Sequence, residues 1–248
     1  MKDKKRGNSD YHDRIELLQK YTAIFGKKTI QCVLGDREFI GKSWVEWLDQ
    51  VQIPYVLRVK ENGQYIGKRN GKMVKVASLF KSLQPGQAKY LGKREIGKTD
   101  SYLSAITLLK APNGQLVALI HSAHISDPCQ VYRRRWEIEL LFKVMKTSGF
   151  DLEATHITLA SRLGTLLAIV AISCCFAYRI GMYYIEKKPP KLKKHGYKPF
   201  NTVRFGLDLL IDMSRGKFVD IRADFYKKTK PLLVTISQYL DRIKIFVV

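Results

Sequence analysis

The chain has 248 residues, of which 46% are hydrophobic, so a sizeable buried core is expected and wholesale disorder is not. It carries 44 Lys and Arg against 22 Asp and Glu, and this formal net charge of +22 predicts a polyanionic partner, either nucleic acid or an anionic membrane surface. The four cysteines form no CxxC pair, which argues against a zinc site and fits a reducing cytosol.

The first quarter of the chain shows an order of elements typical of α/β proteins. The expected elements are a helix over 9–25, a strand over 29–36, a helix over 39–52 and a strand over 53–60. Ser9 is the expected N-cap of the first helix, and Gly26 is expected to end it. Helix and strand in alternation predict a parallel sheet.

Residues 61–126 have a different composition, with short β-prone runs broken by glycines. Asn70-Gly71 and Asn113-Gly114 are hairpin signals. We expect an antiparallel β insertion between two α/β parts.

Helices are expected through most of the remaining chain. Asp127 and Pro128 are a cap and a first-turn residue for a basic helix that runs to about Lys146. A long apolar helix follows over 157–186. Its uncharged run is short of the roughly 20 residues that a bilayer needs, so a fully buried core helix is expected rather than a membrane span. Further helices are expected over 203–213 and 229–245.

The stretch YRRRWEIELLFKVMK, residues 132–146, holds the most specific pattern. On one continuous helix its polar residues would share an arc of roughly 80°. A separate apolar stripe, next to this arc, would face a core and contains Ile138, Leu141, Phe142 and Met145. The polar arc contains Tyr132, Arg135, Glu139, Lys143 and Lys146.

Two interpretations of this arc are open. Arg135, Glu139 and Lys143 have the spacing of ordinary i,i+4 ion pairs, each of which contributes a few tenths of a kcal/mol. Alternatively, the cations hold phosphates beside a carboxylate that binds metal. Asp36 sharpens the second interpretation, because it follows an apolar strand where α/β folds place ligand chemistry, although it could also be a turn former. Two carboxylates can clamp two Mg²⁺ ions for phosphodiester cleavage.

The spacing Y-x2-R-x3-E-x6-K resembles the YREK signature of DDE transposases of bacterial insertion sequences. Tyr132, Arg135, Glu139 and Lys146 carry it. Other segments also resemble this group: GNS (7–9), GDREFIG (35–41), RVKEN (58–62), GFDLEATH (149–156) and KHGYKPFNTVRFGLD (194–208).

The resemblance implies an α/β fold with a ribonuclease H-like catalytic domain, an antiparallel β insertion and a helical C-terminal part. The expected parts are 1–60 and 127–186 for the catalytic domain, 61–126 for the insertion and 187–248 for the helical region. The strand that carries the family's first catalytic Asp has no counterpart, because Asp3, Asp10 and Asp13 precede or lie on the first helix. The resemblance therefore suggests an N-terminally truncated domain that lacks its first strands, and an inactive or impaired chain.

The family's functional residues carry over onto matching positions. Asp36 and Glu139 would be catalytic and would bind two Mg²⁺ ions, for which Mn²⁺ could substitute. The expected DNA-binding residues are Tyr132, Arg135, Trp136, Lys143 and Lys146, although Trp136 could equally be a packing residue. Some relatives stack a flipped base on a tryptophan of the insertion. None of the three tryptophans here lies there, so Tyr90 or Tyr102 would have to take that role.

The resemblance implies a transposase that cleaves transposon ends and joins them to target DNA. Its partners would be double-stranded DNA and a second copy in a homodimer, in the bacterial cytoplasm near the nucleoid and with no membrane. The alternative is a non-catalytic DNA-binding or dimerising remnant, or an inhibitor of full-length transposase. A membrane-surface protein is a third possibility, which the charge alone allows.

Overall fold

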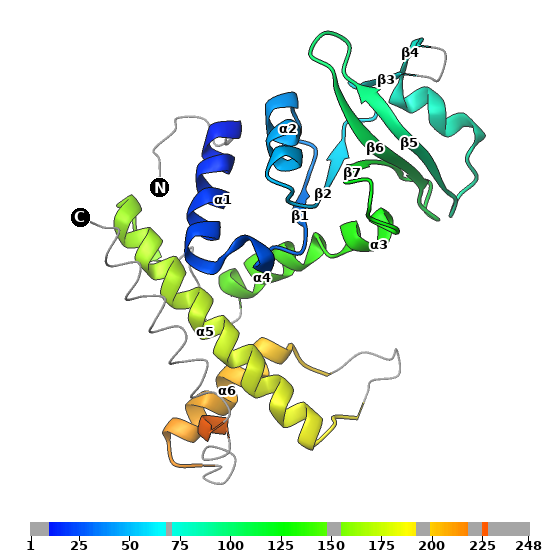
Figure 1. Cartoon of the computed structure of the whole chain (residues 1–248). Coiled ribbons are helices and arrows are strands. Elements are labelled where there is room, and N and C mark those ends of the chain that lie inside the picture. The colour runs from blue at the N-terminus through cyan, green and yellow to red at the C-terminus, as the bar shows by residue number, and fades with distance from the viewer. Residues whose placement is uncertain (1–9, 68–70, 148–154, 192–198, 218–224, 228–248) are drawn as a thin grey trace. The chain divides into compact units, whose positions relative to one another are not determined.

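The computed structural model describes residues 10–67, 71–147, 155–191, 199–217 and 225–227 (Figure 1). The chain divides into two compact units. The N-terminal unit spans Lys4–Trp136, and the C-terminal unit contains Glu137–Val248. Each unit is considered by itself.

A seven-stranded mixed sheet forms the core of the N-terminal unit and confirms the α/β class (Figure 1). Its strand order is β1-β2-β7-β6-β5-β3-β4. The strands are β1 (Val33–Gly35), β2 (Tyr55–Val59), β3 (Tyr65–Gly67), β4 (Met73–Lys75), β5 (Ala88–Ile96), β6 (Tyr102–Lys110) and β7 (Leu116–His121). β1 and β2 pair in parallel, as the alternation of helix and strand predicted, and the remaining described pairs are antiparallel.

Strands β3 to β7 come from the segment predicted to be a β insertion. They do not form a separate sheet, because β7 pairs with β2 and continues the sheet that β1 and β2 begin. The Asn113-Gly114 signal is confirmed at the turn between β6 and β7. There Gly114 has a φ of +83°, and Ala111 and Gln115 close the hairpin with a 2.8 Å backbone hydrogen bond.

The N-terminal unit also contains helices. They are α1 (Tyr11–Phe25), α2 (Lys42–Gln50), α3 (Pro128–Arg133) and the 3₁₀ segments Lys27–Thr29 and Val76–Ser82. Of these, α2 packs into the sheet core and α1 packs against it. Trp44, Val45 and Leu48 of α2 are buried in the same core as Leu57 and Ile106 of the sheet. Each fully buried side chain of this size contributes about 1.5–3 kcal/mol.

The N-terminal helix begins differently from the prediction. Asp10, rather than Ser9, is the N-cap of α1. The Asp13 amide donates to Asp10 Oδ1 at 3.0 Å, and the Asp10 amide donates to Asp13 Oδ2 at 3.3 Å. This reciprocal capping box needs an acidic or amide side chain at the third helical position, which Asp13 supplies. Gly26 ends the helix as predicted, with a φ of +82°.

The C-terminal unit is helical where it is described, which agrees with the predicted helices. It contains α4 (Trp136–Thr147, whose first residue closes the N-terminal unit), α5 (Ala160–Lys187) and α6 (Thr202–Ser214). α5 and α6 cross closely at Gly181 and Gly206, where an added Cβ on either residue would overlap backbone atoms of the other helix. The two glycines therefore set how near the helices approach.

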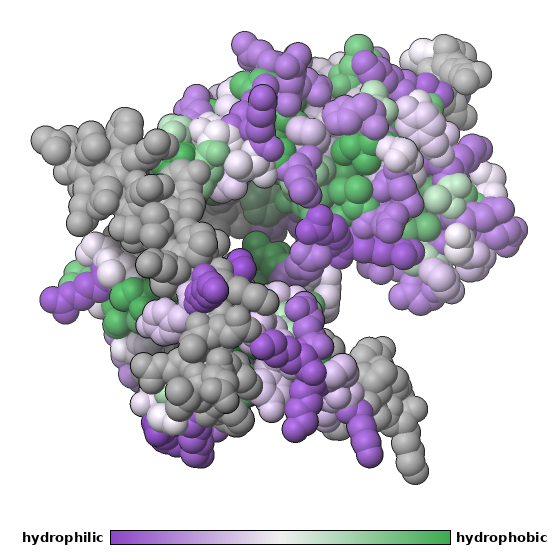
Figure 2. All heavy atoms as spheres, turned by 60° about the horizontal axis from the view of Figure 1, so that its bottom comes forward, coloured by the Kyte–Doolittle hydropathy of each residue, from purple (hydrophilic) through white to green (hydrophobic). Residues whose placement is uncertain are grey.

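Helix α5 is not the fully buried helix that its composition predicted. Only 22% of its most apolar window is buried, and Ile169 is 56% exposed. Among the described residues it is the one helix long and apolar enough to cross a membrane, which by length and composition alone is weak support for a membrane span. Figure 2 shows apolar patches among the hydrophilic side chains on one face of the molecule.

The single basic helix predicted from Asp127 to Lys146 is two helices. α3 ends at Arg133, and α4 begins at Trp136. Between them, the amides of Arg134 and Arg135 donate to carbonyls three residues back, so the turn tightens instead of continuing the α-helical ladder. The predicted arc of five polar side chains on one helix is therefore wrong.

The predicted apolar stripe on this segment is also only partly correct. Val144 and Met145 are buried, whereas Ile138, Leu141 and Phe142 are 50%, 43% and 52% exposed. Several other predictions lie outside the described residues: the GNS segment with Ser9, Asn70, most of 149–156, 194–198 and the helix over 229–245.

Candidate functional site

Asp36 lies directly after β1, as the sequence predicted. β1 pairs with β2 in parallel up to Gly35 and Leu57, so Asp36 and Arg58 are the next residues on neighbouring strands. The Arg37 amide donates to Asp36 Oδ1 at 2.8 Å and orients the carboxylate. The side chain is 46% exposed, so its oxygens are accessible to a ligand.

Helix α3 brings Tyr132 to this carboxylate. The Asp127 side chain caps α3 by accepting from the Gln130 amide at 2.9 Å, and Pro128 fits the first turn, as predicted. The Tyr132 hydroxyl donates to Asp36 Oδ1 at 3.5 Å across 96 residues of chain. Burial, followed by the charge of Asp36, raises the pKa of Tyr132 to about 12. The hydroxyl therefore keeps its proton, and with it the capacity to donate, at neutral pH.

Arg135 also lies close to Asp36, near the other carboxylate oxygen. Its Nη1 is 4.0 Å from Asp36 Oδ2, and its guanidinium lies 5.8 Å from the centre of the Tyr132 ring. The sequence thus correctly grouped Tyr132 with Arg135, and the structure brings both to Asp36 within one unit. The reason is the turn after α3 rather than a shared face of one long helix.

A second ion cluster, which the sequence did not predict as functional, lies beside the first. Arg58 Nη2 donates to Glu61 Oε1 at 3.0 Å and to the Leu116 carbonyl at 3.1 Å. Arg37 Nη2 is 3.5 Å from the same Glu61 oxygen. The charge of Arg58 also lowers the pKa of Tyr132, against the larger effects of burial and Asp36. The available signal was the i,i+3 spacing of Arg58 and Glu61 in RVKEN.

The other predicted site residues lie on α4. Glu139 is partly buried, Lys143 and Lys146 are exposed, and their spacing places them on one face of α4. Trp136 is 57% exposed, which contradicts a role in core packing. Asp36 and Glu139 belong to different units, so their meeting in space stays a prediction.

Of the two tyrosines considered for base stacking, Tyr102 is unsuitable because it is only 5% exposed. Burial keeps its ring inside the sheet core rather than at the surface. Tyr90 is 59% exposed and is accessible to a base.

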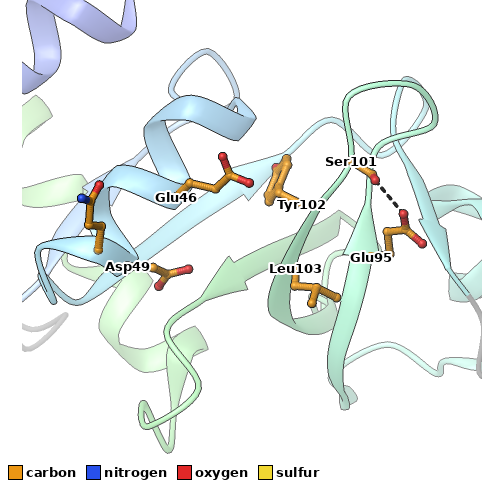
Figure 3. A pocket seen from close by; sticks show the side chains of 7 residues that line it. Glu46, Asp49, Glu95, Ser101, Tyr102 and Leu103 are labelled. Carbon is orange, nitrogen blue, oxygen red and sulfur yellow. Dashed lines mark hydrogen bonds between the residues drawn. The ribbon is translucent and has the colours of Figure 1, made fainter.

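A pocket of about 730 Å³ in the N-terminal unit does not include Asp36 or Tyr132. In Figure 3, Glu46 and Asp49 of α2 line it from one side, and Glu95 and Ser101 lie on the other, joined by a 2.6 Å hydrogen bond. Burial raises the pKa of Asp49. The Asp36 cluster is therefore a surface arrangement at a strand end and not part of this pocket.

The chemistry of the Asp36 carboxylate fits a divalent metal, since Mg²⁺ prefers hard oxygen ligands. Its side-chain contacts with Tyr132 and Arg135 are long, 3.5 and 4.0 Å, and the carboxylate is 46% exposed. No group of three or more His, Cys, Asp or Glu that could hold a metal occurs within the described parts of the chain. Asp36 is thus a single candidate metal ligand, and further ligands would be needed to complete a site.

The site is a strand-end carboxylate with a tyrosine and an arginine beside it, in a mixed α/β protein whose strongly basic composition points to a nucleic-acid partner. The family model described as transposase DDE domain matches residues 8–176, and the chain belongs to this family. No curated protein matches the chain. Members of the family act on DNA and generally use divalent metal ions.

Proposed function

We propose that this chain is a transposase of the YREK group of bacterial insertion sequences. Its reaction is Mg²⁺-dependent cleavage of transposon ends followed by strand transfer to target DNA. The observation that carries the proposal is the contact of Tyr132 and Arg135 with Asp36, because it joins two signature residues to a strand-end carboxylate about 100 residues away.

Asp36 and Glu139 would hold the metal ions in this site. Bound Mg²⁺ would lower the pKa of water and neutralise charge on the scissile phosphate. Arg135, Lys143 and Lys146 would bind flanking phosphates by charge-assisted hydrogen bonds. Tyr132 would orient Asp36 through its protonated hydroxyl and contact a phosphate, and Trp136 would contact DNA from its exposed position.

The proposal includes a ribonuclease H-like catalytic domain formed by 1–60 and 127–186. Residues 61–126 would be its β insertion and 187–248 its helical part. The parallel β1–β2 pair with α2 between its strands supports this assignment, since parallel pairs need such a crossover. Asp10 and Asp13 lie at the cap and first turn of α1, so neither takes the strand position of the family's first catalytic Asp.

The proposed partners are double-stranded transposon-end and target DNA and a second copy of the chain, in the bacterial cytoplasm. A net charge of +22 supports the DNA partner. Affinity for a transposon-end duplex should fall steeply between about 50 and 200 mM salt, and alanine at Lys143 or Lys146 should reduce the salt slope by about 0.9 each. Lys20→Ala is the control, because Lys20 pairs with Glu16 on α1. A flat salt response would contradict DNA binding.

The shared metal site is best tested by Fe²⁺ cleavage of the protein backbone. Fe²⁺ replaces Mg²⁺, and hydroxyl radicals generated with ascorbate and peroxide cut the chain near the metal. We expect cuts near both 36 and 139, and loss of both sets in Asp36→Asn. Asp100→Asn is the control, because that carboxylate is 77% exposed and paired with Lys42. Loss of only the cuts near 36 would mean that the two carboxylates do not share a metal.

The alternative function is a non-catalytic remnant that binds DNA or full-length transposase. It is favoured by the basic composition alone. Expression of the chain beside an active element separates the two functions. If inhibition of transposition survives Glu139→Ala, the remnant is supported, whereas an effect lost in Glu139→Ala and kept in Glu137→Ala supports a role for the metal site.

A further inference from the structure

The segment RVKEN (58–62) contains a buried charged group to which the proposed reaction gives no role. Glu61 is only 9% exposed, and its Oε1 accepts from Arg58 Nη2 at 3.0 Å. The same oxygen lies 3.5 Å from Arg37 Nη2. One buried carboxylate thus binds two guanidinium groups, and a buried charge is kept only where partners compensate it.

Both arginines lie near Asp36. Arg58 follows Leu57 on β2 at the level where Asp36 follows Gly35 at the end of β1, and the charges of Asp36 and Arg58 both act on Tyr132. Arg37 is the next residue after Asp36 in the chain. An arginine fork that paired with Asp36 would occupy both carboxylate oxygens.

Asp36 instead has weak side-chain contacts among the described residues. Tyr132 reaches it at 3.5 Å and Arg135 at 4.0 Å, whereas the short 3.0 Å arginine contact goes to Glu61. Arg58 Nη2 also donates a hydrogen bond to the Leu116 carbonyl at 3.1 Å, and this second contact helps to orient the guanidinium toward Glu61.

We propose that Glu61 is a positioning residue for the Asp36 site. Its carboxylate holds the Arg58 and Arg37 guanidinium groups and so keeps the Asp36 oxygens open to a divalent cation. The metal part of this inference rests on the proposed function, whereas the pairing of the arginines does not. Glu61 would not bind the metal itself but would keep the metal ligand Asp36 accessible, as the hydrogen-bond partners around metal ligands commonly do.

The test compares Glu61→Gln with the unchanged chain in Mn²⁺ titrations, followed by electron paramagnetic resonance. The amide keeps the size of the side chain but removes the charge that holds the arginines. We expect about tenfold weaker Mn²⁺ binding. Glu16→Gln is the matched control, because it removes a carboxylate from an exposed ion pair with Lys20, and it should leave the affinity unchanged.

Arg58→Met in the Glu61→Gln background removes the main competing cation and should recover most of the lost affinity. A merely structural role of Glu61 predicts no such recovery, since the second substitution removes a further buried contact. If the unchanged chain binds Mn²⁺ and Glu61→Gln binds it equally well, the inference is overturned.

A crystal structure of Glu61→Gln gives a readout that does not depend on metal. We expect Arg58 or Arg37 within hydrogen-bond distance of Asp36. If Asp36 keeps its present contacts, Glu61 does not hold the arginines away and the inference is wrong. If the unchanged chain binds no Mn²⁺ while the arginines move as expected, the proposed metal chemistry fails and the counter-ion role of Glu61 stands.

Discussion

The apolar side chains of the sheet in the N-terminal unit are more deeply buried than those of helix α4 in the C-terminal unit. Leu57, Ile106 and Leu108 of the sheet are fully buried, whereas Leu140 and Phe142 of α4 are half exposed. Asp36, Tyr132 and Arg135 are thus fixed on a packed scaffold, while Glu139 lies on a helix with two buried residues, Val144 and Met145. The two parts of the proposed site therefore rest on elements whose apolar side chains are buried to different extents.

The largest effects that test this difference in burial are expected from replacing a leucine by alanine in each of the two elements. Leu108→Ala should destabilise the N-terminal unit by about 2–5 kcal/mol, because it removes a fully buried side chain and leaves a cavity. Leu140→Ala, at a site 50% exposed, should cost less than about 1 kcal/mol. Hydrogen exchange resolved along the chain measures both. Equal losses would mean that α4 is as tightly packed as the sheet.

The α5–α6 crossing is the expected exception within the C-terminal unit. In Gly206→Ala the new Cβ would overlap the Ala177 carbonyl oxygen, and we expect a loss of about 3 kcal/mol because backbone atoms cannot move aside cheaply. Gly164→Ala on α5 is the control. Its Cβ would meet nothing within 4 Å, so this substitution should be neutral or stabilise the helix by up to about 1 kcal/mol. Circular dichroism during urea unfolding compares the two, and comparable stabilities would argue against a close crossing.

Side-chain helix caps occur in both units and allow a comparison with smaller expected effects. Asp127→Ala removes the cap of α3, and Asn201→Ala removes the cap of α6, whose side chain accepts from the Val203 amide at 2.8 Å. Each should cost about 1 kcal/mol. Asp127→Asn, which keeps an acceptor, should lose less than Asp127→Ala. A cap variant with no measurable loss would show that its helix start is held by other contacts.

The smallest expected effect is a pH dependence of the N-terminal unit. Burial lowers the pKa of His121, which lies between Thr107 and the Ser122 carbonyl. Because the unfolded chain binds the proton more readily, stability is full above about pH 6.5 and falls as the pH drops toward the folded pKa. His121→Gln should therefore reduce the difference in unfolding free energy between about pH 7.5 and 5.5.

The exposed residue His12 provides the control for this pH effect. His12→Gln makes the same substitution at a surface position, and its unfolding is measured at the same two pH values. A slope that persists in His121→Gln would assign the pH dependence to other groups.

Local signals in the sequence predicted much of the fold. Gly26, the Asn113-Gly114 turn and the Asp127-Pro128 start were correct because turn and cap geometry depends on a few adjacent residues. The break at Arg134–Arg135 was missed, since three arginines carry no helix-breaking signal. Glu61 was also missed, because nothing in RVKEN indicates that its carboxylate binds Arg37 as well as Arg58.

The amino-acid sequence was enough to show the family through the match over residues 8–176, which the spacing of Tyr132, Arg135, Glu139 and Lys146 had led us to expect. It also determined the α/β class, because the order of elements and the apolar pattern are properties of neighbouring residues. The contacts of Tyr132 and Arg135 with Asp36, the burial of Tyr102 and the exposure of much of α5 became visible only in the folded chain. Contact and burial depend on which distant segments pack together, and that choice is made by the whole chain.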